Sequence, residues 1–237
     1  MGKRLVQQRR GRGSPTHKTN SHRAKTDAKH PKKESLKAEV LSIEHDPMRT
    51  APIAEIQYEN GEKYYILAPE SLSEGEEIEI GVRAPIETGN TLPLAEIPEG
   101  TFIHNIENRP GDGGKLVRSS GTRAILIAHD AGKVVVQLPS KELKEFDPEC
   151  RATIGRVGNS NRKDEKMGKA GKKHHAKKAK GKPYPKVRGV AMNAVDHPFG
   201  GGAHKHVGRP TSVSGNAPPG RKVGHLKSKK TGRGRNK

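Results

Sequence analysis

The charge of this chain is divided into three blocks along the sequence, and this division limits where a folded core can form. Of the 237 residues, 1–34 have a net charge of +9, 35–150 have −10 and 151–237 have +21. Only 30% of the residues are hydrophobic, against roughly 45–50% in an average soluble domain. Apolar burial therefore cannot hold the whole chain in one core. We expect a folded acidic middle between two basic segments that something else must order.

Several classes of protein are disfavoured by what the sequence lacks. No apolar run approaches the length of about 18 residues that a transmembrane helix needs. Residues 1–12 are basic but lack the apolar stretch of a secretory signal. The single cysteine, Cys150, rules out an intramolecular disulfide framework and a zinc site built on cysteines. We therefore expect a reducing, intracellular setting.

The C-terminal basic block predicts a nucleic-acid partner. Its 24 Lys and Arg residues face only three acidic residues, and a dense polyanion would neutralise this excess charge. No amphipathic helix accompanies the charge, which argues against a membrane surface. RNA is favoured over duplex DNA because no basic helix of groove-reading length is evident. The shortage of aromatic residues argues against stacking on single-stranded bases, whereas glycine-rich loops allow the backbone to approach phosphate closely.

The first half of the acidic middle has the alternating pattern of β-strands. Residues 36–43 alternate apolar and polar side chains with a one-residue slip, which predicts a strand with a β-bulge. Strands are also predicted over 53–59, 64–68 and 78–82. Asn60-Gly61 predicts a hairpin between the second and third strands, with positive φ at both residues. Four short strands so close together predict a small barrel.

A second set of short strands follows and predicts a second small barrel. Turn-forming residues rich in Gly, Pro and Asp separate its apolar segments. The run Val134-Val135-Val136 predicts a strand covered on both faces, and residues 141–146 are expected to make one helical turn at most. The predicted strands are 92–97, 101–107, 116–117, 124–128, 134–138 and 152–157. We expect no long helix anywhere in the chain.

These patterns divide the chain into four segments. We expect a basic N-terminal extension over residues 1–34, one barrel over 35–84, a second barrel over 85–160 and a basic Gly-rich extension over 161–237. The predicted fold class is mainly β with long, irregular basic extensions. By composition, the C-terminal extension should become ordered only on its partner.

Three groups of residues could bind a metal, act as a nucleophile or bind phosphate, and each also has a simpler structural interpretation. His197, His204 and His206 could bind a metal, but no cysteine is nearby, so contact with RNA is favoured. Cys150 could be a nucleophile, but it has no evident base partner and is expected to be a structural thiol. The segment 111–115 is similar to a phosphate-binding loop but lacks the following Ser or Thr and a helix. We therefore predict no catalytic residue and no metal site.

Three motifs resemble those of one known family. They are GDGGKLVRSSGT at 111–122, ATIGRVGN at 152–159 and PKVRGVAMNAVDHPFGGG at 185–202. All three are similar to signatures of the universal "L two" family of large-subunit ribosomal proteins. The resemblance covers essentially the whole chain. The segment 202–206 resembles the archaeal and eukaryotic branch, and we expect an archaeal-type member.

The resemblance implies both a fold and a function. It implies an OB-fold barrel followed by an SH3-like barrel, in a primary rRNA-binding protein that is not an enzyme. Such a structural constituent of the large ribosomal subunit supports subunit association, tRNA binding and the peptidyl-transferase centre during translation. The expected partners are large-subunit rRNA, neighbouring ribosomal proteins and, through an intersubunit bridge, the small subunit, with no membrane and no small-molecule substrate. No cofactor is expected beyond Mg²⁺ held through rRNA, and the expected location is the cytoplasm.

The resemblance implies that His197 corresponds to the family histidine associated with peptidyl-transferase activity. Bacterial members have a second histidine where this chain has Phe199. A general base must lie within hydrogen-bond reach of the substrate proton. We therefore expect His197 to order RNA near the catalytic centre rather than to catalyse.

The basic and glycine-rich motifs provide the candidate RNA contacts. We predict that rRNA is contacted by Arg9, Arg10, Arg12, Arg118, Arg156, Asn159, Arg162, Lys163, Arg188, Asn193, His197, Gly200, Gly201, Gly202, His204, His206, Arg209 and Arg221. The residues themselves leave two alternative functions open. One is a general nucleic-acid binder that does not copurify with ribosomes, and the other is an enzyme in which His197 or Cys150 is catalytic.

Overall fold

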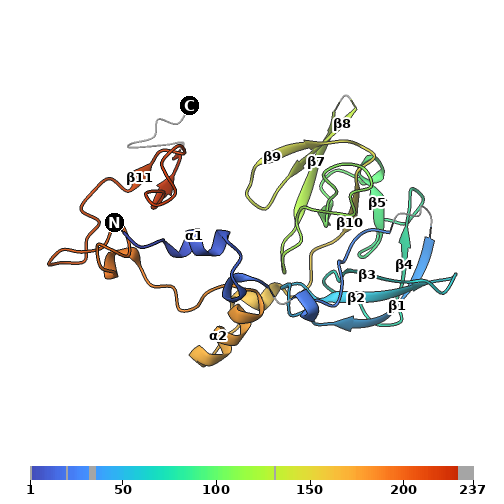
Figure 1. The fold of residues 1–237 in the computed structure, drawn as a ribbon. Helices are drawn as coiled ribbons and strands as arrows, with labels where there is room; N and C mark the ends of the chain where they lie inside the picture. The colour runs from blue at the N-terminus through green and yellow to red at the C-terminus, as the bar shows by residue number, and fades with distance from the viewer. Residues whose placement is uncertain (1, 20, 32–35, 131, 229–237) are drawn as a thin grey trace. The chain divides into compact units, whose positions relative to one another are not determined.

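The structure is a computed structural model that describes residues 2–19, 21–31, 36–130 and 132–228 (Figure 1). The chain separates into two compact units. Residues 21–168 form the first, which we call the barrel unit. Residues 1–20 and 169–237 together form the second, which we call the basic unit. No helix within the described ranges is both long and apolar enough to cross a membrane.

The first barrel lies at the start of the barrel unit. Its strands are β1 (Leu36–Glu44), β2 (Ile53–Tyr58), β3 (Lys63–Leu67) and β4 (Glu77–Ile80). They pair antiparallel in the order β3-β2-β1-β4 around a core that includes Ile56 and Ile78. The register of β1 against β2 shifts between Val40 and Ser42. This shift confirms the predicted β-bulge.

The hairpin between β2 and β3 has a different turn from the predicted one. Tyr58 donates its N–H to the Glu62 carbonyl at 3.0 Å, so three residues rather than two form the loop. Gly61 has a φ of 80°, whereas Asn60 is not left-handed. Asn60 instead accepts the Glu62 N–H on its Oδ1 at 3.0 Å. The prediction of positive φ at both residues is wrong because a three-residue loop needs only one left-handed residue.

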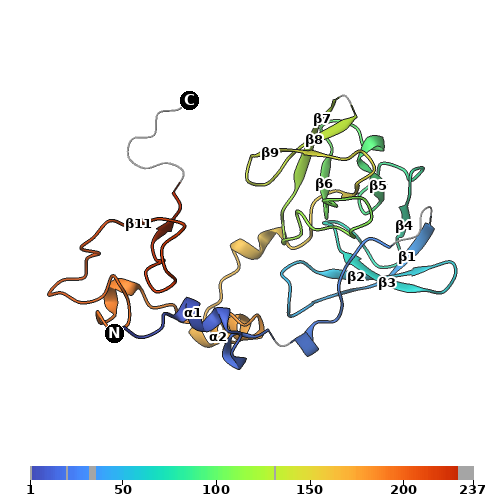
Figure 2. The ribbon, with the colours of Figure 1, turned by 45° about the horizontal axis from the view of Figure 1, so that its top comes forward.

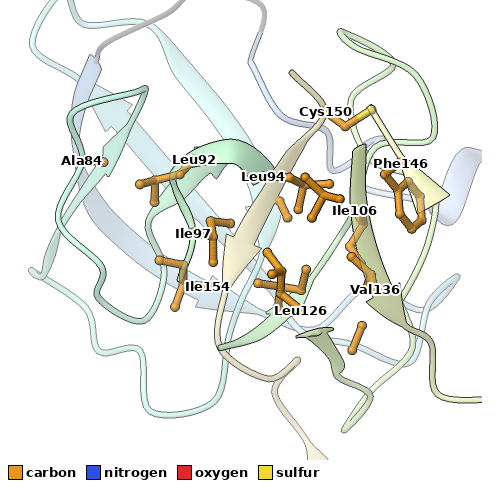
Figure 3. Close-up of a cluster of buried hydrophobic side chains, with 14 residues drawn as sticks. Ala84, Leu92, Leu94, Ile97, Ile106, Leu126, Val136, Phe146, Cys150 and Ile154 are labelled. Atoms are coloured by element: carbon orange, nitrogen blue, oxygen red, sulfur yellow. The ribbon is translucent and has the colours of Figure 1, made fainter. Parts of the chain in front are cut away.

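The second barrel continues the same sheet. Its strands are β5 (Thr91–Pro93), β6 (Phe102–His104), β7 (Ala124–Asp130), β8 (Lys133–Gln137), β9 (Leu143–Phe146) and β10 (Arg151–Ile154). Their order is β5-β10-β6-β7-β8-β9, and Thr91 of β5 pairs with Ile80 of β4. Figure 3 shows the apolar side chains, Leu126 and Val136 among them, that point toward one another in its core. This arrangement confirms the expected mainly-β class, an OB-fold barrel followed by an SH3-like barrel.

Several local predictions for the second barrel are wrong. Residues 116–117 are not a strand, because Leu116 makes only an isolated bridge with Ile106, and residues 94–96 of the predicted strand 92–97 form a 3₁₀ helix. Residues 143–146 form β9 rather than a helical turn, because they pair with β8 in a hairpin in which Lys141 has a φ of 67°. Val135 is only half-buried, although Val134 and Val136 are 1% and 0% exposed. The valine run is therefore fully covered on one face alone.

Residues 26–31, which precede β1, lie against both barrels, and we call them the strap (Figure 2). The Lys29 N–H donates to the Tyr65 carbonyl of β3 at 3.3 Å, and the His30 N–H donates to the Gly113 carbonyl of the second barrel at 3.1 Å. Three guanidinium groups donate to strap carbonyls, namely Arg49 to Thr26, Arg118 to Ala28 and Arg151 to Pro31. The strap thus belongs to the hydrogen-bonded body of the barrel unit, although its sequence falls within the basic N-terminal block.

The basic unit contains short elements joined by turns. They are the helices α1 (Val6–Gly11) and α2 (Ala170–Ala179), the 3₁₀ helices Pro15–His17 and Gly189–Ala191, and the parallel pair β11 (Ser212–Val213) and β12 (His225–Leu226). Further 3₁₀ helices lie in the barrel unit at Ser21–Arg23, Leu94–Glu96 and Ser160–Lys163. β11 pairs Ser212 with His225 and Val213 with Leu226.

α2 is a basic helix that the sequence analysis did not predict. Its ten residues include six Lys or His side chains and none that is buried. Alanine and lysine have high intrinsic helix propensity, which accounts for the helix despite the repulsion between its charges. A helix of this length would span about 15 Å.

Candidate nucleic-acid interface

The basic unit joins two segments that lie almost 200 residues apart in the sequence. The Lys3 N–H donates to the Val195 carbonyl at 2.8 Å, and the Lys3 Nζ lies 3.4 Å from the Asp196 Oδ1. Gln7 donates from its Nε2 to the Lys222 carbonyl at 2.5 Å. Leu5 is only 5% exposed and anchors this contact by apolar burial. The N-terminal and C-terminal basic segments therefore form one structural unit.

A hollow of about 330 Å³ opens where these two segments meet, and we call it the cationic hollow. Four of the predicted RNA-contacting residues line it, namely His197, Gly200, Arg209 and Arg221. Lys3 and Asp196 line it as well. The formal charge of its side chains is three cations against one carboxylate, with His197 neutral. A positive hollow of this kind attracts anions such as phosphate.

His197 holds the turn that forms one wall of this hollow. Its Nδ1 accepts the Phe199 N–H at 3.0 Å, and the two rings lie 5.3 Å apart. This hydrogen bond places the proton of the neutral imidazole on Nε2. Burial lowers the pKa of His197, which favours the neutral form. A Cβ added to Gly189 would lie 2.3 Å from the His197 ring, so glycine is required there.

The other predicted residues divide between the two units. In the basic unit, exposed positions are occupied by Arg9, Arg10, Arg12, Arg188, Asn193, Gly201, Gly202, His204 and His206. Three exposed residues of the barrel unit follow β10. Asn159 directly precedes the 3₁₀ helix Ser160–Lys163, and Arg162 and Lys163 lie within it. All these residues are exposed and open to a partner, and their contact with rRNA stays a prediction.

Arg118 and Arg156 differ from the exposed arginines because the protein itself occupies their donors. Arg118 donates to the Gly114 carbonyl at 2.6 Å and to the strap at Ala28, and burial lowers its pKa. Arg156 donates from Nε to the Gly121 carbonyl at 3.0 Å and lies 3.5 Å from Glu70. Contact of either residue with rRNA, which stays a prediction, would compete with these interactions.

The glycine-rich segment 111–114 already surrounds a carboxylate. Glu107, whose side chain is 0% exposed, accepts the Gly113 N–H at 3.0 Å and the Gly111 N–H at 3.2 Å. It also pairs with Arg151 at 3.0 Å. Burial alone would raise the pKa of Glu107, but the hydrogen bonds and charge of Arg151 hold it below its usual value. The loop is thus an anion-binding nest for the protein's own side chain.

Cys150 and the histidines offer little support for catalysis or metal binding. Cys150 is fully buried, and this burial raises the pKa of its thiol to about 11, which disfavours the nucleophilic thiolate. Within the described ranges, no three His, Cys, Asp or Glu side chains are grouped closely enough to hold a metal ion. The absence of a metal site in the chain as a whole stays a prediction.

Two family models match this chain. Residues 3–80 match the RNA-binding N-terminal domain of ribosomal proteins L2, and residues 87–217 match the C-terminal domain of the same proteins. The second match alone covers more than half of the sequence.

The chain belongs to the ribosomal protein L2 family.

Relatives of this L2 family member come from archaea, which confirms the expected archaeal type. It is 59% identical to large ribosomal subunit protein uL2 of Methanothermobacter thermautotrophicus, over 99% of this chain and 100% of the relative. It is 60% identical to uL2 of Methanobrevibacter smithii, over 98% and 99%. It is 56% identical to uL2 of Haloarcula marismortui, over the full length of both.

Sequence reasoning missed the part that residues 2–7 of this L2 family member play in the cationic hollow. Lys3 was not among the predicted contacts, and neither was the anchor Leu5. One signal was present, because Leu5-Val6 is the only pair of adjacent apolar residues between residues 2 and 31. Such a pair in a basic segment indicates local burial, but it does not name the partner.

Proposed function

We propose that this chain is a structural, rRNA-binding component of the large ribosomal subunit in the cytoplasm. The observation that carries this proposal is the basic unit, in which Lys3 from the N-terminal segment and four predicted contacts from the C-terminal segment line one cationic hollow. The family match and the names of the archaeal relatives support the same function. In this role the chain supports subunit association, tRNA binding and the peptidyl-transferase centre.

The two units contribute in different ways. The barrel unit is stabilised by buried apolar clusters and by the strap, so it provides a rigid body without a ligand. The basic unit buries few apolar side chains, Leu5 and Val223 among them, and exposes most of its Lys and Arg residues. Large-subunit rRNA supplies the counter-charge that orders it.

His197 acts in this proposal as a scaffold for RNA rather than as a general base. Its Nδ1 is occupied by the Phe199 N–H, so the proton of the neutral ring is on Nε2, and this atom donates rather than accepts. A proton acceptor at the reaction centre would need the opposite tautomer. We expect His197→Asn, which retains an acceptor for the Phe199 N–H, to preserve peptide-bond formation in reconstituted subunits, while a loss of 100-fold or more would favour catalysis.

The proposed partners are large-subunit rRNA, neighbouring ribosomal proteins and the small subunit through an intersubunit bridge. Neither a membrane nor a small-molecule substrate is required. No cofactor is needed beyond Mg²⁺ held through rRNA.

Sedimentation of a cell lysate on sucrose gradients at moderate and high salt tests this function. We expect the chain to sediment with the large subunit and to stay there through the high-salt wash. A chain found at the top of the gradient, or spread over all RNA and DNA, would instead support a general nucleic-acid binder.

A further inference from the structure

We propose that residues 2–5 and 194–221 together form one subsite for a single phosphate group of the RNA backbone. The inference deepens the proposed rRNA-binding function and rests on it. It makes the N-terminal segment a required part of the C-terminal RNA site, rather than a separate basic arm.

The first argument is the fixed position of Lys3. Its backbone is tied to Val195 by a 2.8 Å hydrogen bond, and the burial of Leu5 holds the segment from the other side. A Cβ added to Gly2 would lie 3.3 Å from the Val195 carbonyl, so the two backbones run in close contact. Lys3 therefore reaches the hollow from a defined direction, unlike a lysine on a free chain end.

The second argument is the charge balance of the hollow. Asp196 pairs with Lys3, but within the part of the chain that the structure describes no carboxylate lies within 4.0 Å of Arg209 or Arg221. Both arginines are exposed. Asp196 fixes the direction of Lys3, and two positive charges remain for an anion. A guanidinium group offers the paired donors that phosphate oxygens accept best.

The third argument is the size and wall of the hollow. Its volume of about 330 Å³ admits a phosphate with part of its ribose and hydration, since a water takes about 30 Å³ in the liquid. Gly200 packs so closely on Asn193 that an added Cβ would lie 2.3 Å from the Asn193 carbonyl. Gly200 itself lines the hollow and has no side chain, so a phosphate can approach the backbone at this point.

The test measures how binding of the full-length chain to protein-free large-subunit rRNA depends on salt. We expect Lys3→Gln and Arg221→Gln each to raise Kd by about fivefold. Because Lys3, Arg209 and Arg221 share a single phosphate, the triple variant with all three changed to Gln should reduce the slope of log K against log salt by only about 0.7 to 0.9. A control pair outside the hollow, Arg188→Gln with Lys205→Gln, is expected to lose two separate phosphate contacts and to reduce the slope by about 1.4 to 1.8.

Leu5→Ala provides an independent variant that leaves every charge in place. We expect it to raise Kd as much as Lys3→Gln does, and to add nothing in the Lys3→Gln background. Circular dichroism of the β structure verifies that the barrel unit remains folded in each variant.

Two results would overturn the shared subsite. One is a Lys3→Gln variant with unchanged Kd, and the other is a slope change of the triple variant that is as large as that of the control pair or larger. Either result leaves the proposed function intact, because the unaltered chain still binds rRNA. Failure of the unaltered chain to bind would refute the proposed function itself.

Discussion

Two histidines of the barrel unit are buried and remain neutral in the folded state. His30 is 4% exposed and donates from Nε2 to the Asn105 carbonyl at 2.6 Å. His104 is 0% exposed, with its Nδ1 3.0 Å from the Gly155 carbonyl. Burial lowers the pKa of each to about 4. The histidines therefore couple the stability of this unit to pH.

We predict that the barrel unit loses stability as the pH falls from about 6.5 to about 4. Between these pH values the two histidines are protonated in the unfolded chain but remain neutral in the folded chain. Lowering the pH therefore favours unfolding. The loss should be on the order of 3 kcal/mol for each histidine at most. Urea unfolding followed by circular dichroism at several pH values measures it. In the His30→Gln variant, unfolding in this pH range should take up one proton fewer, so the free energy of unfolding should depend less steeply on pH. A pH dependence equal to that of the unaltered chain would contradict the prediction.

The buried ion pair between Glu107 and Arg151 also contributes to the stability of the whole barrel unit. We predict that Glu107→Gln lowers the free energy of unfolding by roughly 3–5 kcal/mol. The substitution leaves the guanidinium of Arg151, whose side chain is 11% exposed, without its counter-charge. Glu145→Gln is a matched control, because Glu145 and its partner Lys133 are both more than 60% exposed. The control should leave the urea midpoint almost unchanged, and equal effects of the two substitutions would contradict the prediction.

At the scale of elements, local sequence patterns predicted the strands well and the longer contacts poorly. The slip in alternation at residues 36–43 located the β-bulge, because side-chain direction alternates residue by residue. No comparable pattern links Lys3 to Val195, since contacts between distant segments leave no periodic signal. Charge alone also fails to distinguish Arg118, which donates to protein carbonyls, from the exposed Arg162.

The helix α2 is the element whose stability depends most on a partner. It has ten residues and buries none of them, and isolated helices shorter than about 12–15 residues are marginal in water. We predict that amides of residues 171–179 exchange rapidly with solvent in the free chain and become protected by at least tenfold when rRNA is bound. Hydrogen exchange followed by mass spectrometry measures this change. Strands β7 and β8 are an internal control, and they should be protected in both states.

At the scale of the whole molecule, the division of charge follows the division into units except at residues 21–34 and 151–168, which belong to the basic blocks of the sequence but to the barrel unit of the fold. The barrel unit includes the acidic block and has its own apolar cores, whereas the basic unit gathers cationic segments from both ends of the sequence. Net repulsion within the basic unit opposes folding without a polyanion. Binding and ordering of this unit are therefore expected to be one coupled event, whose affinity is controlled by counterion release.

This coupling predicts a steep dependence of rRNA affinity on salt. If about ten phosphates are contacted, log K should fall against log salt with a slope of about −7 to −9, the steeper value applying to duplex RNA surfaces. The basic unit contains most of the predicted rRNA contacts, so most of the slope should originate there. Filter binding of the full chain to large-subunit rRNA across a salt series measures the slope. A slope near zero would mean that apolar or base-edge contacts, rather than phosphate neutralisation, hold the chain on its RNA.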